Sequence, residues 1–207
     1  MSLRDSLFAM TYDRQIARAE EAGLRDMRKR LLAGAKGSVI EIGGGTGANL
    51  AWYGPEVKSL TVTEPVTAMV RKLERHVTEL GSSATVLRAP AEDLPFEAGT
   101  FDVAVSTLVL CGVDDQPRAL RELRRVLRPG GTLLFFEHLR AQDPKRARQQ
   151  DKMNWLNRIV VRCDCNRPTL DTIRQAGFTV TAVEPTALPK SPPFVTPAII
   201  GTATSPA

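Results

Sequence analysis

The sequence has no long apolar run and few aromatic side chains. No stretch approaches the roughly 18 apolar residues of a transmembrane helix, so we expect no stable membrane insertion. Residues 1–14 lack the apolar core of a secretory signal peptide, and the cytoplasm is the expected location. The 2 tyrosines and 7 phenylalanines form no stacking platform, which argues against nucleic acid as a partner.

Cysteine is also scarce, and its 3 copies are too few for a disulfide framework. Cys163 and Cys165 are separated by a single residue, which is not the spacing of common zinc sites, and Cys111 cannot complete four ligands. We therefore expect reduced, structural cysteines and no metal.

The charge is of both signs, with a net value of +5. The excess Lys and Arg residues are spread over residues 25–30, 118–128 and 145–152, each time among apolar residues at helical spacing. This pattern indicates solvated helix faces and not a nucleic-acid patch. Attraction to acidic substrates or membrane surfaces stays open.

A glycine-rich loop follows an apolar strand that contains Glu41. Gly43, Gly45 and Gly47 occupy alternate positions after that strand. Without Cβ atoms such a turn can pass close under a ligand, and a helix that begins there aims free N–H groups at it. The loop predicts a nucleoside-like cofactor at the carboxyl end of a parallel strand.

Glu41 decides between two cofactors, because the loop also fits the dinucleotide pattern G-x-G-x-x-G/A. A carboxylate two residues before the first glycine would repel a pyrophosphate and attract a cation. S-adenosylmethionine carries a sulfonium and an ammonium group, so it fits better than NAD.

A second acid ends the next apolar run. Glu64 lies 17 residues after Gly47, close to the usual spacing of a carboxylate that accepts hydrogen bonds from ribose hydroxyls. Pro65 then suits the first turn of a helix. The alternative for Glu64 is a solvated charge at a helix N-terminus.

Apolar strand-like runs alternate with helical periodicity along the chain, as in a doubly wound α/β sheet with helices on both faces. The expected strands are residues 38–42, 58–64, 85–88, 101–107, 132–137, 178–183 and 197–204, and the expected helices are residues 12–32, 47–53, 66–80, 117–127, 143–162 and 168–176. We expect a turn over residues 128–131, a loop over 185–193, and antiparallel pairing of the last two strands.

With these motifs in order, the sequence resembles the Rossmann-like S-adenosylmethionine-dependent methyltransferases. The resemblance runs from about Ser38 to Phe178, through the segments 41–47, 63–65, 91–96, 101–105 and 127–131. It implies a seven-stranded sheet, mostly parallel with one antiparallel strand.

The resemblance also implies a set of cofactor-binding residues: Tyr12, Glu41, Gly43, Gly44, Gly45, Gly47, Asn49, Glu64, Pro65, Ala91, Glu92, Ser106, Thr107 and Leu108. Gly43, Gly45 and Gly47 would line the methionine and ribose portions, and Ala91 and Glu92 would meet the adenine. The backbone of Ser106 would accept from the cofactor's amino group. Tyr12 would close over the cofactor, or simply pack.

A narrower resemblance joins the chain to small methyltransferases that act on alkyl thiols. It is carried by residues 107–113, by residues 135–138 and by the segment Cys163-Asp164-Cys165, in which Asp164 displaces one of that family's paired cysteines. Animal members have an N-terminal hydrophobic anchor that this sequence lacks, so membrane attachment is not implied.

Two residues are candidates for catalysis. His138, at the end of the fifth strand, would act as a base or stabilise a thiolate, or else be a structural histidine. Asp114 would orient the substrate, although helix capping is the favoured explanation for it. His76, on a polar helix, is expected to be solvated.

The acceptor site is predicted from apolar residues near the same edge of the sheet. Leu110, Cys111 and Trp155 are the candidate substrate-binding residues. Residues 143–162 fall where relatives carry a lid, and their apolar positions Met153, Trp155, Leu156, Ile159 and Val160 would cover the pocket, unless they form an ordinary amphipathic helix.

The sequence thus predicts one domain. Residues 1–35 would form an N-terminal helical cap, 36–140 the cofactor core, 141–167 the lid, and 168–207 a last helix with closing strands. The expected activity is methylation of a small-molecule thiol, by a monomer or homodimer. Methylation of nitrogen or oxygen on a phospholipid head group or natural product is the enzyme alternative, and a non-catalytic S-adenosylmethionine-binding regulator is the other.

Overall fold

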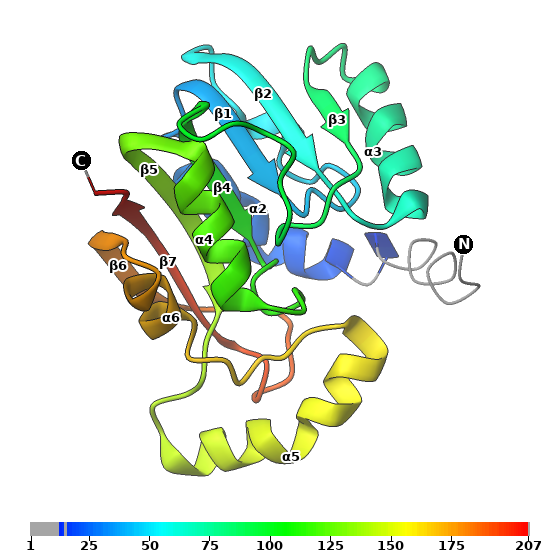
Figure 1. Ribbon diagram of the computed structural model, residues 1–207. Helices are drawn as coiled ribbons and strands as arrows, with labels where there is room; N and C mark the ends of the chain where they lie inside the picture. Colours follow the sequence, from blue (N-terminus) through cyan, green and yellow to red (C-terminus); the bar gives the residue numbers. More distant parts are fainter. Residues whose placement is uncertain (1–12, 15, 207) are drawn as a thin grey trace.

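A seven-stranded sheet in the order β3-β2-β1-β4-β5-β7-β6 is the centre of the computed structural model, which describes residues 13, 14 and 16–206 (Figure 1). Its strands are β1 (Gly37–Ile42), β2 (Val57–Thr63), β3 (Thr85–Leu87), β4 (Phe101–Thr107), β5 (Leu127–His138), β6 (Thr179–Ala187) and β7 (Pro197–Thr204). β7 runs antiparallel to β5 and β6, and the other pairs are parallel. The predicted α/β fold with one antiparallel strand is confirmed.

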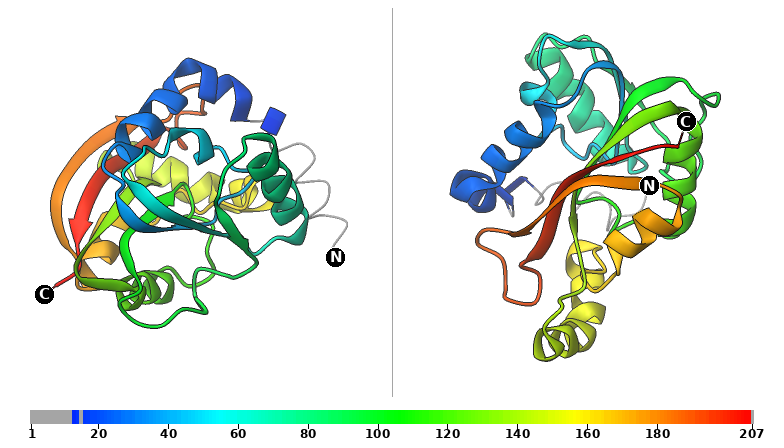
Figure 2. Two further views of the ribbon diagram at one scale, coloured as in Figure 1. Left: turned by 90° about the horizontal axis from the view of Figure 1, so that it is seen from above. Right: turned by 90° about the vertical axis from the view of Figure 1, so that its left-hand side faces the viewer.

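Helices lie against both faces of this sheet (Figure 2). The helical elements are the π-helical turn η1 (Glu20–Leu24), α2 (Arg25–Leu32), the 3-10 turn η2 (Leu50–Trp52), α3 (Thr67–Glu79), α4 (Gln116–Val126), α5 (Pro144–Val161) and α6 (Thr169–Gln175), of which α5 does not lie on a face of the sheet. None of these helices has the length and hydropathy that crossing a bilayer requires.

Alternation along the strands divides the core into two layers. On β5, Leu133 and Phe135 join the cluster that packs under α4 and α6, while Leu134 and Phe136 join the cluster under α2 and α3. Side chains of successive strand residues point to opposite faces, so one strand serves both layers. Phe135 and Phe136 are fully buried, and each such side chain contributes about 1.5–3 kcal/mol.

Three sequence expectations about element boundaries were wrong. The expected turn at residues 128–131 is the first part of β5, and β6 continues through Pro185, which an edge strand tolerates because its N–H side can face solvent. The expected helix over residues 47–53 is reduced to η2, because Gly47 has a left-handed φ of +94°.

α5 lies apart from the helical layers, at the edge where the parallel strands end (Figure 1). Its polar residues hold it there. The Gln150 amide donates to the carbonyls of Leu139 and Cys165 and accepts from the N–H of Ala141, and Asn157 donates to the carbonyl of Cys163. These bonds fix the segment after α5 against the end of β5.

Candidate functional site

A cavity of about 740 Å³ opens at the carboxyl ends of β1, β2 and β4. Many of the predicted site residues line it, namely Gly43, Gly45, Glu64, Pro65, Ala91, Glu92, Leu108, Cys111, Asp114 and Trp155. The cavity therefore joins the predicted cofactor loops to the predicted acceptor residues, at the edge where ligands bind in parallel sheets.

The glycine loop needs glycine at two of these positions. Gly43 and Gly45 have left-handed φ values of +58° and +57°, which other residues adopt only with strain. A Cβ on Gly43 would also lie 2.6 Å from Cγ1 of Val109. The backbone can thus form the cavity floor only without side chains.

Glu64 connects the glycine loop to the end of β2. Its Oε2 accepts a hydrogen bond from the N–H of Gly45 at 3.0 Å, and its Oε1 accepts one from the N–H of Val66 at 2.9 Å. Burial raises the pKa of this carboxyl, while the two N–H donors act in the opposite direction. A carboxylate has about four acceptor positions, so places remain for ribose hydroxyls.

Glu41 is buried behind the loop and does not line the cavity. It accepts hydrogen bonds from Asn49 Nδ2 at 2.9 Å and from the Tyr53 hydroxyl at 2.6 Å. Burial raises its pKa, and these two donors oppose that shift. Its charge would therefore reach a cationic ligand through space, not through a hydrogen bond.

Arg28 completes this network, and sequence reasoning missed it. Its side chain donates to Asn49 Oδ1 at 3.0 Å, to Thr107 Oγ1 at 3.1 Å and to Glu20 Oε1 at 3.0 Å. It is 3% exposed, although it lies in a stretch expected to be a solvated helix face. Asn49 and Thr107 thus support the loop from behind and do not line the cavity.

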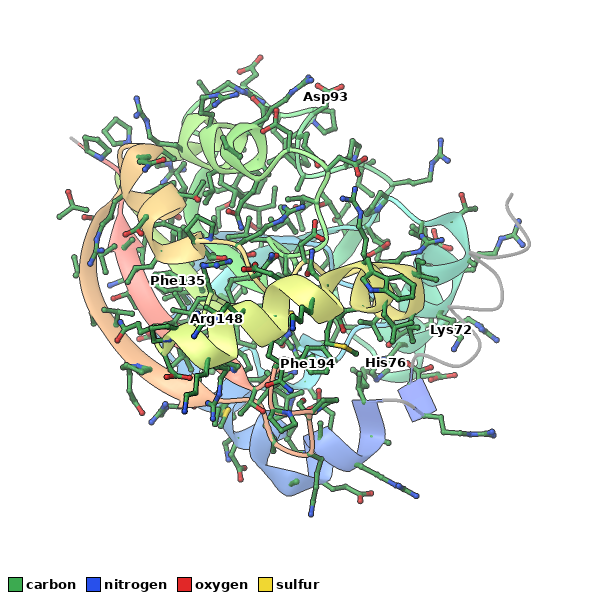
Figure 3. The ribbon with its side chains drawn as sticks, turned by 90° about the horizontal axis from the view of Figure 1, so that it is seen from below. Lys72, His76, Asp93, Phe135, Arg148 and Phe194 are labelled. Carbon is green, nitrogen blue, oxygen red and sulfur yellow. The ribbon has the colours of Figure 1, made fainter. Side chains whose placement is uncertain are left out.

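Other predicted cofactor residues act through packing. Gly44 packs against Val62, where a Cβ would collide with the valine side chain, and Gly47 lies beside Leu50 and His76. The Nδ1 atom of His76 is 3.0 Å from the carbonyl oxygen of Thr46, and the residue, which was expected to be solvated, is partly exposed. His76 is labelled in Figure 3.

Ser106 and Tyr12 complete the predicted cofactor set. The hydroxyl of Ser106 donates to Glu137 Oε1 at 2.6 Å, and the side chain is fully buried. Tyr12 lies outside the described residues.

The side of the cavity where we expect the adenine is tied to the start of α4. Glu92 Oε1 accepts from the N–H groups of Asp114 at 2.7 Å and Asp115 at 3.2 Å. Asp115 is the N-cap, since its side chain accepts from the N–H of Arg118 at 2.9 Å. The capping role considered for Asp114 was therefore wrong, and its side chain lines the cavity.

A left-handed residue shapes the far wall. Leu108 has φ +60°, which is uncommon outside glycine, and its N–H donates to the carbonyl of Phe136 at 2.7 Å. The turn aims the N–H groups of Val109 and Leu110 at the carboxylate of Glu137, each at 3.1 Å. Burial raises the pKa of Glu137 to about 7.

Cys111, His138 and Cys163 meet beside this wall, from three separate elements. Their two sulfurs and one ring nitrogen lie within 4.8 Å of one another, and all three residues are buried. The Cys111 hydrogen bond and the nearby His138 lower the pKa of Cys163, against the effect of burial. Cys111 lines the cavity, whereas His138 and the fully buried Leu110 do not.

Part of the apolar surface of the expected lid lines the cavity, although Trp155 and Ile159 are 65% and 56% exposed. Trp155 and Ile159 of α5 line the cavity, together with Arg158. Leu156 and Val160 do not line it and are 38% and 54% exposed.

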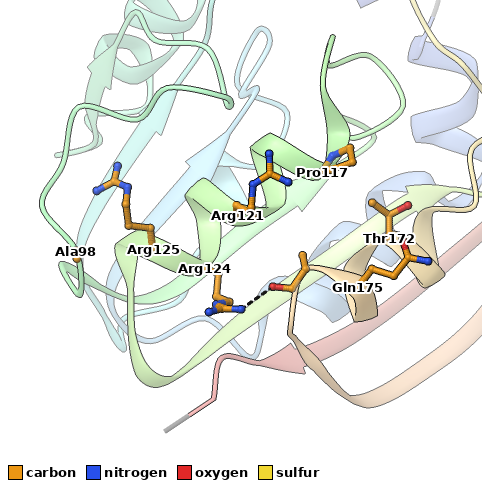
Figure 4. A pocket seen from close by; sticks show the side chains of 8 residues that line it. Ala98, Pro117, Arg121, Arg124, Arg125, Thr172 and Gln175 are labelled. Carbon is orange, nitrogen blue, oxygen red and sulfur yellow. Dashed lines mark hydrogen bonds between the residues drawn. The ribbon is translucent and has the colours of Figure 1, made fainter.

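A second hollow of about 620 Å³ lies between α4 and α6, away from the strand ends (Figure 4). Arg121, Arg124 and Arg125 line it. Arg124 donates to the carbonyl of Ala176 at 3.0 Å, and Arg125 is paired with Glu122 at 2.7 Å. Two of the three guanidinium groups are thus used within the protein, and the strand-end cavity is the stronger candidate site.

Known proteins match this fold and this loop. Residues 40–135 match the family described as a methyltransferase domain. These residues therefore form a methyltransferase domain of the S-adenosylmethionine-dependent type. Its methyl donor is accordingly S-adenosylmethionine, and the cradle formed by Gly43, Gly45 and Glu64 fits that cofactor.

Two human relatives have names that state an activity. The chain is 35% identical over 138 residues to thiol S-methyltransferase TMT1A, covering 65% of this chain and 56% of the relative. It is 43% identical over 114 residues to thiol S-methyltransferase TMT1B, covering 52% of this chain and 46% of the relative. The methyltransferase thus spans about half the length of these relatives.

A solved structure with S-adenosyl-L-homocysteine bound has the same fold. The geranyl diphosphate C-methyltransferase of Streptomyces coelicolor A3(2) matches with a TM-score of 0.70 and 14% identity, over 88% of this chain and 78% of that chain. At this identity the match concerns the fold.

Proposed function

We propose that this methyltransferase transfers a methyl group to the thiol sulfur of a small molecule. The observation that carries the proposal is the single cavity that runs from the glycine loop to Cys111. Donor and acceptor can then meet inside one space without a domain movement. A volume of about 740 Å³ is within the usual range for small ligands, about 300–1,000 Å³.

The protein's main contribution is to align the two sulfur atoms and keep water away. S-adenosylmethionine, when bound, supplies an electrophilic methyl group on a sulfonium. Gly43, Gly45 and Glu64 would hold the donor, and Trp155 and Ile159 would cover the acceptor. Fixed alignment lowers the entropic part of the barrier, and a site with little water suits a step in which the sulfonium charge is lost.

A thiol acceptor is favoured by two features. The two human relatives are named thiol S-methyltransferases. In addition, a free thiol has a pKa of about 8.5, so a sizeable fraction becomes thiolate with modest help. His138, buried beside Cys111, is close enough to this wall of the cavity to influence that ionisation.

The test is a methyl-transfer screen with S-adenosylmethionine across small alkyl thiols, amines, phenols and phospholipids. We expect thioether products from the thiols, identified by mass spectrometry. Activity confined to amines, phenols or phospholipids would reject the thiol preference. Binding of S-adenosylmethionine without transfer to any of the four classes would support a regulatory protein.

A variant pair links the activity to the cavity. Trp155→Ala should raise KM for the thiol and leave the Kd of S-adenosylmethionine nearly unchanged, because Trp155 belongs to the acceptor wall. Leu156→Ala is the matched control, since Leu156 is on the same helix but outside the lining. Equal effects of the two substitutions would contradict a covering role for Trp155.

A further inference from the structure

The cluster of Cys111, His138 and Cys163 has the composition of a metal site. Cys111 follows β4, His138 ends β5 and Cys163 follows α5, so three distant parts of the chain supply one ligand atom each. Those atoms lie within 4.8 Å of one another. The exposed fractions of the residues are 3%, 5% and 7%, so the protein has buried three metal-ligating groups together.

The imidazole of His138 gives a second, independent observation. Its Nδ1 atom is buried and has no hydrogen-bond partner among the described residues. Buried polar atoms in folded proteins nearly always have a partner, and an exception calls for an explanation such as an unseen ion. A histidine that binds a metal through one ring nitrogen usually hydrogen-bonds a neighbouring group through the other. The Nδ1 atom of His138 has no such partner among the described residues, so it is available as a ligand atom.

The carboxylates near the cluster already accept hydrogen bonds from other groups, so we do not count them among the metal ligands. Glu137 accepts from Ser106 and from two backbone N–H groups. Asp164 accepts from Asn154 Nδ2 and from Arg167 Nη2, each at 2.8 Å. The candidate donor set is therefore two sulfurs and one nitrogen.

We propose that Cys111, His138 and Cys163 bind a zinc ion and leave one coordination position open toward the cavity. Zinc prefers thiolate and imidazole ligands, at about 2.3 Å and about 2.0 Å, and three protein ligands with one open position are typical of catalytic zinc. The ligand atoms need only a small inward movement to reach a common ion. The sequence led us to expect no metal, because cysteine spacing along the chain does not reveal that His138 joins Cys111 and Cys163 in space.

The packing around the cluster points the open position toward the cavity. Cys111 is part of the cavity lining, together with its neighbours Gly112 and Val113. Elsewhere Val195 packs in the same apolar cluster as the cysteines, and Phe194 packs against it. Phe194 lies on the loop next to α5 in Figure 3.

This inference rests on the proposed function for its chemical role. An acceptor thiol that takes the open position would give its proton to water and bind zinc as a thiolate. The acceptor sulfur would then form a bond to the methyl carbon as the carbon–sulfur bond of the donor breaks. S-adenosylhomocysteine leaves as a neutral thioether, and the zinc ion keeps its charge throughout.

The site is tested with the full chain, purified under reducing conditions and stripped of metal. Cobalt is the probe, because cobalt bound by thiolates absorbs strongly through charge transfer. We expect one cobalt ion per chain with that absorption, displaced by zinc. Cys111→Ser and Cys163→Ser should each weaken cobalt binding at least about tenfold, because even the loss of a group that only orients a metal ligand costs about 10–100-fold in affinity.

Cys165→Ser is the matched control, because Cys165 is fully buried in the same apolar cluster but is not one of the three ligands. It should keep the cobalt spectrum. Absence of thiolate absorption in the unsubstituted chain would overturn the proposal whatever the variants do. Equal loss in all three serine variants would also overturn it.

Two further measurements separate this inference from the proposed function. An alkyl thiol added to the cobalt form should change its absorption, and an unchanged spectrum would reject the open position. Thiol methylation at the same rate with and without zinc would overturn the role of the metal while the thiol methyltransferase stands. Zinc binding without thiol methylation would reject the proposed function and support the site alone.

Discussion

The Oε2 atom of Glu64 accepts a hydrogen bond from the backbone N–H of Gly45 at 3.0 Å. The bond joins two sequence motifs that are 19 residues apart and end neighbouring parallel strands. The carboxylate that we predict to bind the ribose thus also accepts a hydrogen bond from the glycine loop. Loop geometry and the predicted ribose contact therefore depend on the same side chain.

Glu64→Gln should weaken S-adenosylmethionine binding about 10- to 100-fold, since a hydrogen bond to a charged group contributes about 1.5–3 kcal/mol. Isothermal calorimetry measures the change directly. Asp93→Asn is the matched control, because Asp93 is an exposed carboxylate near the same cavity edge and does not line it. A similar Kd for Glu64→Gln and Asp93→Asn would argue against ribose recognition by Glu64.

Stability and cofactor affinity should depend on pH with opposite signs. Burial raises the pKa of both Glu41 and Glu64 above the ordinary value of 4.5. Between pH 4.5 and the raised pKa values, the folded protein holds protons that the unfolded chain has lost. Without cofactor, the free energy of unfolding should therefore fall as pH rises through this window. The cationic cofactor favours the carboxylates, so its Kd should increase as pH falls through the same window.

Urea denaturation and calorimetry at a series of pH values above and below 4.5 check both signs. Glu64→Gln removes one of the two groups, so its stability should vary less with pH. A cofactor-free protein that becomes more stable as pH rises through the window would contradict the burial of these carboxylates.

Local sequence patterns predicted the fold and the cavity floor because each depends on short-range chemistry. The glycine loop after β1, Glu64 after β2 and Asp114 before α4 all lie at the cavity as expected. Parallel strands bring their ends to one edge, so correct strand boundaries place these residues without knowledge of side-chain contacts.

Residues that depend on contacts between distant elements were not predictable in this way. Arg28 has the same local surroundings as its exposed neighbour Arg30, and only the approach of Asn49 and Thr107 buries it. Cys111 and Cys163 are 52 residues apart, and local cysteine spacing carries no information about their meeting with His138.

Arg28→Met should lower the free energy of unfolding by about 3–5 kcal/mol, because it leaves the buried Asn49 and the partly buried carboxylate of Glu20 without this partner. Arg30→Met is the control. Arg30 forms an ion pair with Glu184 in which both side chains are more than half exposed, and such pairs contribute about 0–1 kcal/mol. Chemical denaturation compares the two, and equal losses would show that Arg28 is not held as described.

We expect substitution of Asp114 to change acceptor binding and substitution of Asp115 to change the stability of the fold. Asp115→Ala removes the N-cap of α4 and should lower the free energy of unfolding by about 1 kcal/mol with little effect on KM. Asp114→Ala keeps the N–H that bonds Glu92 but removes a carboxylate from the cavity lining, so it should raise KM for the acceptor and change stability by less than about 0.5 kcal/mol. Thermal denaturation and steady-state kinetics on both variants decide the matter, and a KM that responds to Asp115 more than to Asp114 would reverse the assignment.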